Sequence, residues 1–204
     1  MNILKEKISG DPKHGDPTNL EEIKEIDFTK RFSLEGLILV DEKNLPINPK
    51  ENPTANGKGT LWYLGPNHAA DPIVTTWING SPYILLITRQ NGELAFPGGM
   101  KDQNENHRQT AERELEEETS VKLDFSKAKI IYSGIVYNDP RNTQNAWIET
   151  VAFHLHIKNG EKLKIKAGDD AKKVEWVAIE EIKKGRKKLY AYHGEILKML
   201  DIYK

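Results

Sequence analysis

The sequence predicts an α/β or α+β sandwich, and three observations lead to this prediction. The 204 residues suffice for one domain of ordinary size, or for one domain with a small additional lobe. Hydrophobic residues make up 37% and charged residues 30%, which is typical of a globular protein with a modest core. Segments of strand length are interspersed with segments of helical composition, and this order favours a sandwich over a helix bundle.

The first third of the chain is predicted to be mostly irregular. Residues 1–30 are polar and charged and are expected to form a loose lead-in. Two apolar runs, Ser33–Val40 and Gly59–Leu64, are predicted strands. Proline, asparagine and glycine in Asn44–Lys58 and Gly65–Pro72 predict loops there.

The middle of the chain carries the clearest local signals. The apolar run Tyr83–Thr88 has the length of a strand, and Asn91-Gly92 after it is a tight-turn signal. Glu93–Phe96 is therefore expected to return as a paired strand, and Pro97-Gly98-Gly99 ends regular structure. Residues 106–118 contain no glycine or proline and many strong helix formers, so they predict a helix.

The last third is expected to complete the sheet and to close with a helix. Ile130–Tyr137 and Trp147–Ile157 are predicted strands joined by a polar loop, and Lys173–Ile179 is a further strand. Residues 193–203 predict a helix, because apolar residues recur on one of its faces. The side chains expected on that buried face are Ile196, Leu197, Leu200 and Tyr203.

Acidic residues dominate the predicted helix, where five of the seven residues at 112–118 are glutamates. Because a helix advances ~100° per residue, Glu114, Glu117 and Glu118 lie within one sector of roughly 100°, and the other two glutamates point away. Like charges at this spacing repel each other by a few tenths of a kcal/mol per pair in the open, and by more when partly buried. A divalent cation would remove that penalty.

Carboxylate oxygens select Mg²⁺ or Mn²⁺ over softer metals, and Mg²⁺ also binds substrate phosphates. Arg113 is expected to neighbour Glu117 and to hold it by a charge-assisted bond. Glu105 can reach back from the loop before the helix, and Gly98-Gly99 lets the backbone approach the metal and phosphates. The alternative is a solvated acidic face, which is the commoner role of a glutamate-rich helix.

The spacing of these residues resembles the Nudix box, Gly-x5-Glu-x7-Arg-Glu-apolar-x-Glu-Glu-x-Gly-apolar. One position departs, since Ser120 stands where the box has its second glycine, the residue that normally ends the helix in a left-handed conformation. The positions that match are Gly99, Glu105, Arg113, Glu114, Leu115, Glu117, Glu118 and Val121.

The resemblance extends into loops and covers residues from about 59 to 192. Within the Nudix hydrolase family, the chain is similar to mitochondrial ADP-ribose pyrophosphatases and to the ADP-ribose-binding domains of melastatin-type cation channels. The segments that carry this similarity are Gly65–Pro72, Asp139–Thr143, Asn145–Thr150 and Ala167–Ala171. The resemblance implies an α/β/α sandwich with a mixed central sheet over residues 59–204, with residues 1–58 as an N-terminal extension or small lobe.

The same resemblance implies Mg²⁺-dependent hydrolysis of ADP-ribose to AMP and ribose 5-phosphate, with Mn²⁺ as the other metal considered. It implies Glu114 and Glu118 as metal ligands, with Glu117, Glu105 and Gly98 assisting, and Arg113 with the glutamates as the catalytic set. Which carboxylate acts as the base is left open. The residues implied in substrate binding are Asn67, His68, Asp71, Asp139, Arg141, Tyr190 and His193.

Most of the implied binding residues also have a plainer structural interpretation. Arg141 suits a forked contact to a diphosphate oxygen, or else a surface salt bridge. Asp139 could bond the ribose or the adenine, or simply open a turn. Tyr190 could stack on adenine or pack on the core. The cluster of Asn67 and His68 with Asp71 could form a binding loop, or Asn67 and His68 could cap the backbone of a turn.

Composition excludes other kinds of chemistry. Without cysteine the chain has no disulfide, thiol nucleophile or cysteine-ligated zinc. A net charge of −1 argues against nucleic acid as a partner, and the lack of a long apolar run argues against a membrane span or a secretory signal. A cytoplasmic location is therefore expected, and the family resemblance implies a monomer. His154 and His156 share a strand face, which suits zinc less well than an ordinary packing role.

Two alternative functions remain open on sequence grounds. The chain could hydrolyse another nucleoside diphosphate compound, because the box specifies the bond class but not the base or sugar. It could also be a non-catalytic ADP-ribose sensor, as in channels whose box is degraded. The intact pairs Arg113-Glu114 and Glu117-Glu118 favour an enzyme.

Overall fold

The computed structural model describes residues 15–168 and 171–203. The chain forms two compact units, one of residues up to 68 with 134–149, the other of residues 69–133 with 150 onwards. Strands β1 (Gly65–Ile78) and β6 (Ala146–His156) contribute residues to both units. The domain boundary expected between residues 58 and 59 stays a prediction.

Seven strands within the described residues form one mixed sheet, in the order β3-β2-β1-β6-β5, with β4 paired to β1 and β7 to β2. The predicted strands at 83–88, 130–137, 147–157 and 173–179 are confirmed, with small shifts at their ends. The predicted hairpin is also confirmed, because Ile87 pairs with Ala95 and Thr88 with Leu94. The remaining strands are β2 (Ser81–Arg89), β3 (Leu94–Ala95), β4 (Gly99–Met100), β5 (Lys129–Ile135) and β7 (Ala171–Ala178).

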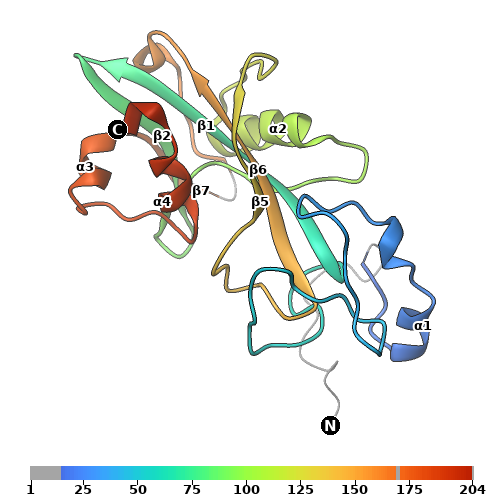
Figure 1. Cartoon of the computed structure of the whole chain (residues 1–204). Coiled ribbons are helices and arrows are strands. Elements are labelled where there is room, and N and C mark those ends of the chain that lie inside the picture. Colours follow the sequence, from blue (N-terminus) through green and yellow to red (C-terminus); the bar gives the residue numbers. More distant parts are fainter. Residues whose placement is uncertain (1–14, 169–170, 204) are drawn as a thin grey trace. The chain divides into compact units, whose positions relative to one another are not determined.

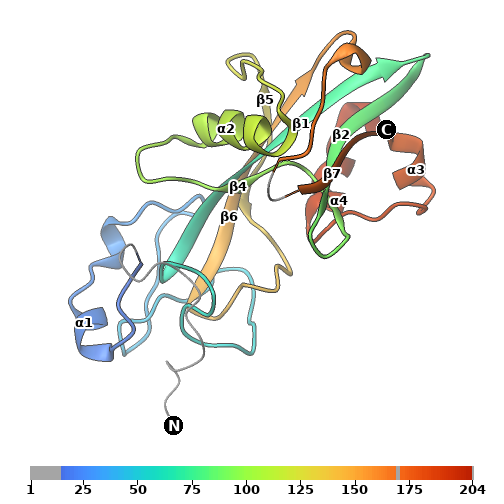
Figure 2. The ribbon, with the colours of Figure 1, turned by 180° about the vertical axis from the view of Figure 1, so that it is seen from behind.

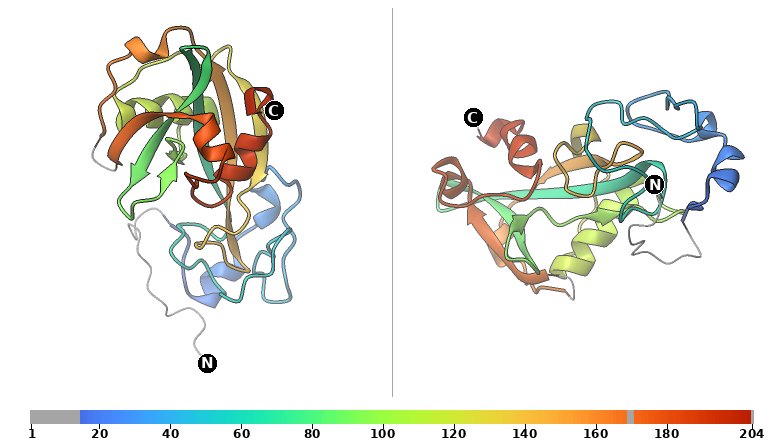
Figure 3. Two further views of the ribbon diagram at one scale, coloured as in Figure 1. Left: turned by 90° about the vertical axis from the view of Figure 1, so that its left-hand side faces the viewer. Right: turned by 90° about the horizontal axis from the view of Figure 1, so that it is seen from below.

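Helices cover both faces of the strands in the second unit. Helix α2 (His107–Thr119) lies on one face, and α4 (His193–Lys198) lies on the other, as Figures 1, 2 and 3 show. A short helix, α3 (Ile179–Lys183), follows β7. The main core of this unit consists of Ile73, Ile84, Leu86, Phe96, Ala152, Val177, Ile179, Ile196, Leu197 and Leu200. The predicted α/β/α sandwich is therefore confirmed.

The first unit has its own small core, and this corrects the expected loose lead-in. Helix α1 (Leu20–Lys24) and the 3₁₀ helix η1 (Phe28–Lys30) bury Ile23 and Phe28 almost completely. They pack with Ile38, Leu64, Ile135 and Trp147. Residues 15–30 are ordered because these two apolar side chains have a core to join. Residues 1–14 lie outside the described part of the chain.

Three predictions about the segments before residue 73 were wrong. Ser33–Val40 forms no strand, and its leucines Leu37 and Leu39 are 70% and 62% exposed. Gly59–Leu64 forms turns and bends. Gly65–Pro72, expected as a loop, is the first half of β1, where Ala69 pairs with Met100 and Ala70 with Gly99. Pairing partners distant in the sequence override the local signals of proline and glycine.

The closing helix is shorter than predicted. α4 ends at Lys198, and the 3₁₀ helix η3 (Asp201–Tyr203) follows it. Bonds from Met199 N–H to the Ile196 carbonyl and from Leu200 N–H to the Leu197 carbonyl tighten the last turn into 3₁₀ geometry. The predicted buried positions Ile196, Leu197 and Leu200 are confirmed, while the Tyr203 side chain lies outside the described residues. None of the described helices has the length and apolar character needed to cross a membrane.

Candidate active site

The acidic helix α2 begins at a complete capping box. The Asn106 side chain accepts hydrogen bonds from the backbone N–H groups of Arg108 and Gln109, and the Gln109 side chain accepts from Asn106 N–H at 2.9 Å. Ala111 and Leu115 are fully buried and hold the helix against the sheet. The start of the helix and its buried side together determine which face the glutamates occupy.

The helix ends at Ser120, which adopts the left-handed conformation with φ 56° and ψ 21°. Its N–H bonds the Glu116 carbonyl at 2.9 Å. Serine thus takes the backbone conformation that the box glycine would supply. Residues from the loop before β7 complete the cap, because Lys166 N–H bonds the Thr119 carbonyl at 2.9 Å and Gly168 N–H bonds the Glu118 carbonyl at 3.1 Å.

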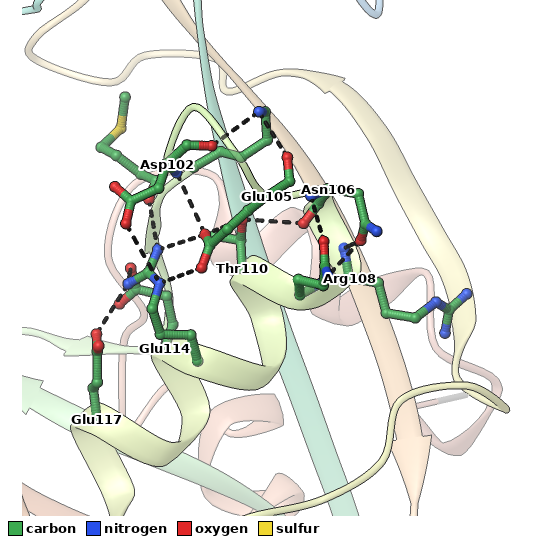
Figure 4. Close-up of polar contacts among 11 residues, drawn as sticks. Asp102, Glu105, Asn106, Arg108, Thr110, Glu114 and Glu117 are labelled. Carbon is green, nitrogen blue, oxygen red and sulfur yellow. Dashed lines mark hydrogen bonds and ion pairs between the residues drawn. The ribbon is translucent and has the colours of Figure 1, made fainter. Parts of the chain in front are cut away.

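Arg113 is the centre of the acidic cluster. Its Nε and Nη2 bond the two carboxylate oxygens of Glu105 at 2.8 and 3.0 Å. Its Nη1 bonds Glu114 at 2.7 Å and Glu117 at 2.9 Å, and its Nη2 also bonds the Met100 carbonyl at 3.0 Å. Figure 4 shows Glu105, Glu114 and Glu117 gathered at one side of the helix. The expected contact between Arg113 and Glu117 is confirmed, and the guanidinium also holds two further carboxylates.

The carboxylates of this cluster differ in their surroundings. Burial raises the pKa of Glu114, against the opposing effect of Arg113. The bonds from Arg113 lower the pKa of Glu105. The Glu117 side chain is 57% exposed, whereas Glu118 accepts a bond from Gly98 N–H at 2.9 Å. A Cβ at Gly99 would lie 2.3 Å from the Glu114 carboxylate, so a larger residue here would displace that carboxylate from its position.

The remaining two glutamates of the helix point away, as predicted. Glu112 accepts a bond from Phe125 N–H at 2.9 Å. Glu116 pairs with Lys122 at 3.1 Å at the exposed surface. Only one side of the helix therefore carries the concentrated negative charge.

The donor set fits a hard dication, although its ligands are not assembled. Among the described residues, no three acidic or histidine side chains converge as a preformed metal group. Glu105, Glu114 and Glu117 are turned towards Arg113, and Glu118 is turned towards Gly98. One guanidinium neutralises only part of the charge of four carboxylates, and their oxygens are the donors that Mg²⁺ and Mn²⁺ prefer.

Asp71 and His193 lie close together beside the loop Pro97-Gly98-Gly99. Asp71 accepts a 2.6 Å bond from Thr150, and its Oδ1 lies 3.7 Å from His193 Nε2. His193 Nδ1 accepts the backbone N–H of Phe96 at 3.0 Å, and its ring stacks on the Phe96 ring at 4.6 Å. A side chain at Gly98 would lie 2.5 Å from Asp71 Oδ1. The structure thus brings together predicted residues that are 122 positions apart.

Asn67 and His68 lie in the first unit. The buried Asn67 side chain bonds Tyr63 N–H and the carbonyls of Tyr63 and Gly65, which matches the backbone-cap interpretation. His68 Nε2 lies 3.0 Å from the Phe32 carbonyl. Its Nδ1 lies 3.8 Å from the buried Glu149.

Asp139 and Arg141 form a forked ion pair, also in the first unit. Arg141 Nε and Nη2 bond the two carboxylate oxygens of Asp139 at 2.9 and 2.8 Å. The Asp139 side chain is 1% exposed, whereas that of Arg141 is 38% exposed. This geometry shows Asp139 orienting the Arg141 guanidinium. A direct contact of either residue with substrate stays a prediction.

Sequence reasoning missed several residues of these networks. Thr150 was quoted only as part of a similar segment, and Arg89, whose guanidinium lies 4.1 Å from the centre of the Tyr190 ring, was not considered. Glu149 was also missed, although it is fully buried and accepts bonds from Ser33 and Trp147. A charged residue inside a predicted buried strand was the available signal for Glu149.

The sandwich and the arginine-centred carboxylates on α2 together define a class of protein, the Nudix domain. The family model described as "NUDIX domain" matches residues 67–200. The chain belongs to this family.

Several individual proteins are similar in sequence or fold to this chain. The mitochondrial ADP-ribose pyrophosphatase of Rattus norvegicus is 35% identical over 234 residues, which cover 93% of this chain and 64% of that protein. A nudix hydrolase of Caenorhabditis elegans is 42% identical over 167 residues, 76% of this chain and 62% of that one. The chain thus spans less than two thirds of the length of these relatives. The NUDIX domain of Shewanella oneidensis NrtR, solved with ADP ribose, has a TM-score of 0.56 at 20% identity, covering 74% of this chain and 91% of its own, and shares the fold.

Proposed function

We propose that this chain hydrolyses the diphosphate of ADP-ribose to AMP and ribose 5-phosphate, with Mg²⁺ or Mn²⁺ as cofactor. The observation that carries the proposal is the set of carboxylates around Arg113, with Glu118 beside the Gly98 backbone. ADP-ribose is favoured as substrate by the identity to the rat pyrophosphatase over almost the whole chain.

The residues of the cluster have distinct tasks in this reaction. Glu114 and Glu118, with Glu117, would hold the metal, which when bound polarises a phosphoryl oxygen. Arg113 keeps Glu105 and Glu117 in place through charge-assisted bonds. One carboxylate of the cluster accepts a proton from water, whose oxygen bonds to phosphorus as the bridging P–O bond breaks. One water is consumed, and the two products each carry one phosphate.

A second candidate is an ADP-ribose sensor without efficient turnover. A melastatin-type channel relative from Nematostella vectensis is 34% identical over 198 residues, 82% of this chain but only 12% of the channel. The complete carboxylate set around Arg113 favours hydrolysis over binding alone.

A product assay separates the candidates. The protein is incubated with Mg²⁺ and a panel of nucleoside diphosphate compounds, and the products are separated by chromatography. AMP formed fastest from ADP-ribose supports the proposal, and faster cleavage of another compound redirects it to that substrate. Binding of ADP-ribose without any product supports the sensor and refutes the hydrolase.

A pair of glutamine variants tests the metal role. Glu118→Gln is expected to lower the rate on the order of a thousandfold or more, because it removes a charged ligand of the cation. Glu116→Gln on the opposite side of the same helix is the matched control and is expected to keep its activity. Near-normal turnover by Glu118→Gln would contradict the assigned role.

A further inference from the structure

Arg89 lies over an aromatic ring, as Arg108 does over Phe153, but the ring beside Arg89 belongs to the predicted ligand-contacting residue Tyr190. Arg89 is the last residue of β2, and its guanidinium lies 4.1 Å from the centre of the Tyr190 ring. In the part of the chain that the structure describes, no carboxylate forms a hydrogen bond or ion pair with it. Arg113 and Arg186, by contrast, are each bonded to glutamates. Arg89 is thus a half-buried cation beside an aromatic ring, with no carboxylate partner among the described residues.

A series of ring contacts joins Arg89 to the glycine loop of the candidate active site. The Tyr190 ring meets the His193 ring edge-on at 5.9 Å, and His193 stacks on Phe96 at 4.6 Å. Phe96 directly precedes Pro97-Gly98-Gly99, whose Gly98 N–H bonds Glu118. All of these residues belong to one compact unit. Arg89 therefore belongs to the same packed assembly as two predicted ligand-contacting residues.

The hairpin holds the Arg89 backbone in place. Its N–H bonds the Glu93 carbonyl at 2.8 Å, and its carbonyl accepts Gly92 N–H at 2.9 Å. Tyr190 is anchored on the adjacent strand by a 2.7 Å bond from its N–H to the Leu94 carbonyl. The contact with the Tyr190 ring restrains the Arg89 side chain, so less side-chain entropy is lost when its N–H groups bind an acceptor.

We propose that Arg89 is a substrate-binding residue that binds a phosphate oxygen of the nucleotide. The proposal rests on the proposed function, because it takes the ligand to be a nucleoside diphosphate. A guanidinium is planar and presents its N–H donors in a fork that matches the geometry of phosphate oxygens. A cation without a carboxylate partner does not have to break an ion pair before it binds an anion.

Binding measurements on three variants test the proposal. Isothermal titration with ADP-ribose, in the absence of metal, is carried out on the wild type, Arg89→Lys, Arg89→Met and the control Arg186→Ala. Arg89→Met keeps the aliphatic stem without charge and is expected to weaken binding tenfold to a hundredfold. Arg89→Lys keeps the charge without the fork and is expected to recover part of that loss. Arg186→Ala removes one surface charge remote in sequence and is expected to bind as the wild type does.

Other outcomes would overturn the proposal. If Arg89→Met binds within twofold of the wild type, Arg89 does not contact the ligand. If Arg89→Lys and Arg89→Met are equally weak, the residue supports Tyr190 by packing and binds no phosphate. Failure of the wild type to bind ADP-ribose would overturn it as well. Binding with the expected order of variants but without hydrolysis would refute the hydrolase and leave the Arg89 assignment standing.

Discussion

Replacing Ser120 by glycine should stabilise the protein, because Ser120 ends the acidic helix at φ 56°. The left-handed conformation costs a residue with a Cβ about 1–2 kcal/mol of folded-state stability, and it costs glycine nothing. Glycine also raises the conformational entropy of the unfolded chain, which lowers stability by about 0.4–1 kcal/mol. The net gain expected for Ser120→Gly is therefore about 0.5–1 kcal/mol. For a chain of this size, the melting temperature should rise by about 1–4 °C.

Thermal and urea denaturation measure this gain. Ser81→Gly is the control, because Ser81 is also exposed but does not have a positive φ. That variant is expected to lose about 0.5–1 kcal/mol, the ordinary cost of glycine. The rate of the proposed ADP-ribose hydrolysis should stay unchanged in Ser120→Gly, because serine already holds the required backbone conformation. A lower stability of Ser120→Gly than of the wild type would refute the reasoning about the helix end.

Three further measurements follow from the structure. Gly168→Ala is expected to lower the free energy of unfolding by at least about 1–3 kcal/mol, because the new Cβ would overlap the Glu117 carbonyl. Gly194→Ala has open space around the new Cβ and is expected to raise the free energy of unfolding by about 0.5–1 kcal/mol. Thermal denaturation measures both changes. Burial lowers the pKa of His154 from 6.5 to about 4, so the unfolded chain binds more protons in that window and stability is lost as pH falls from 6.5 to 4. His154→Gln should remove on the order of 1–2 kcal/mol of this pH dependence, after allowance for partial exposure, and an unchanged profile would exclude His154 as its source. Mg²⁺ should raise the melting temperature of the wild type and raise it less in Glu114→Gln; equal shifts would argue against Glu114 as a ligand.

Short-range patterns explain why the acidic helix and its face were predictable from the sequence. Capping by Asn106, the absence of glycine and proline, and the spacing of the glutamates all act within a few residues. Glu114, Glu117 and Glu118 share a sector because helix geometry requires it. The strand Tyr83–Thr88 and its hairpin turn were likewise determined locally.

Contacts between residues distant in the sequence decided which segments of the first third of the chain form strands. β1 includes a segment rich in loop-forming residues, because Ala69 and Ala70 find partners on β4. The apolar run at 33–40 forms only an isolated bridge between Val40 and Pro46 and is otherwise irregular, with Leu37 largely exposed. Strand formation depends on what lies beside a segment, which a single sequence does not state.

The same division holds for the candidate site. The sequence by itself determined the acidic edge of α2, because one helix carries it. Only the tertiary structure placed His193 against Asp71, Arg89 over Tyr190 and both oxygens of Glu105 on Arg113. Hydrogen bonds and ion pairs act over a few ångströms, so side chains remote in the sequence interact only where the folded backbone brings them within that range.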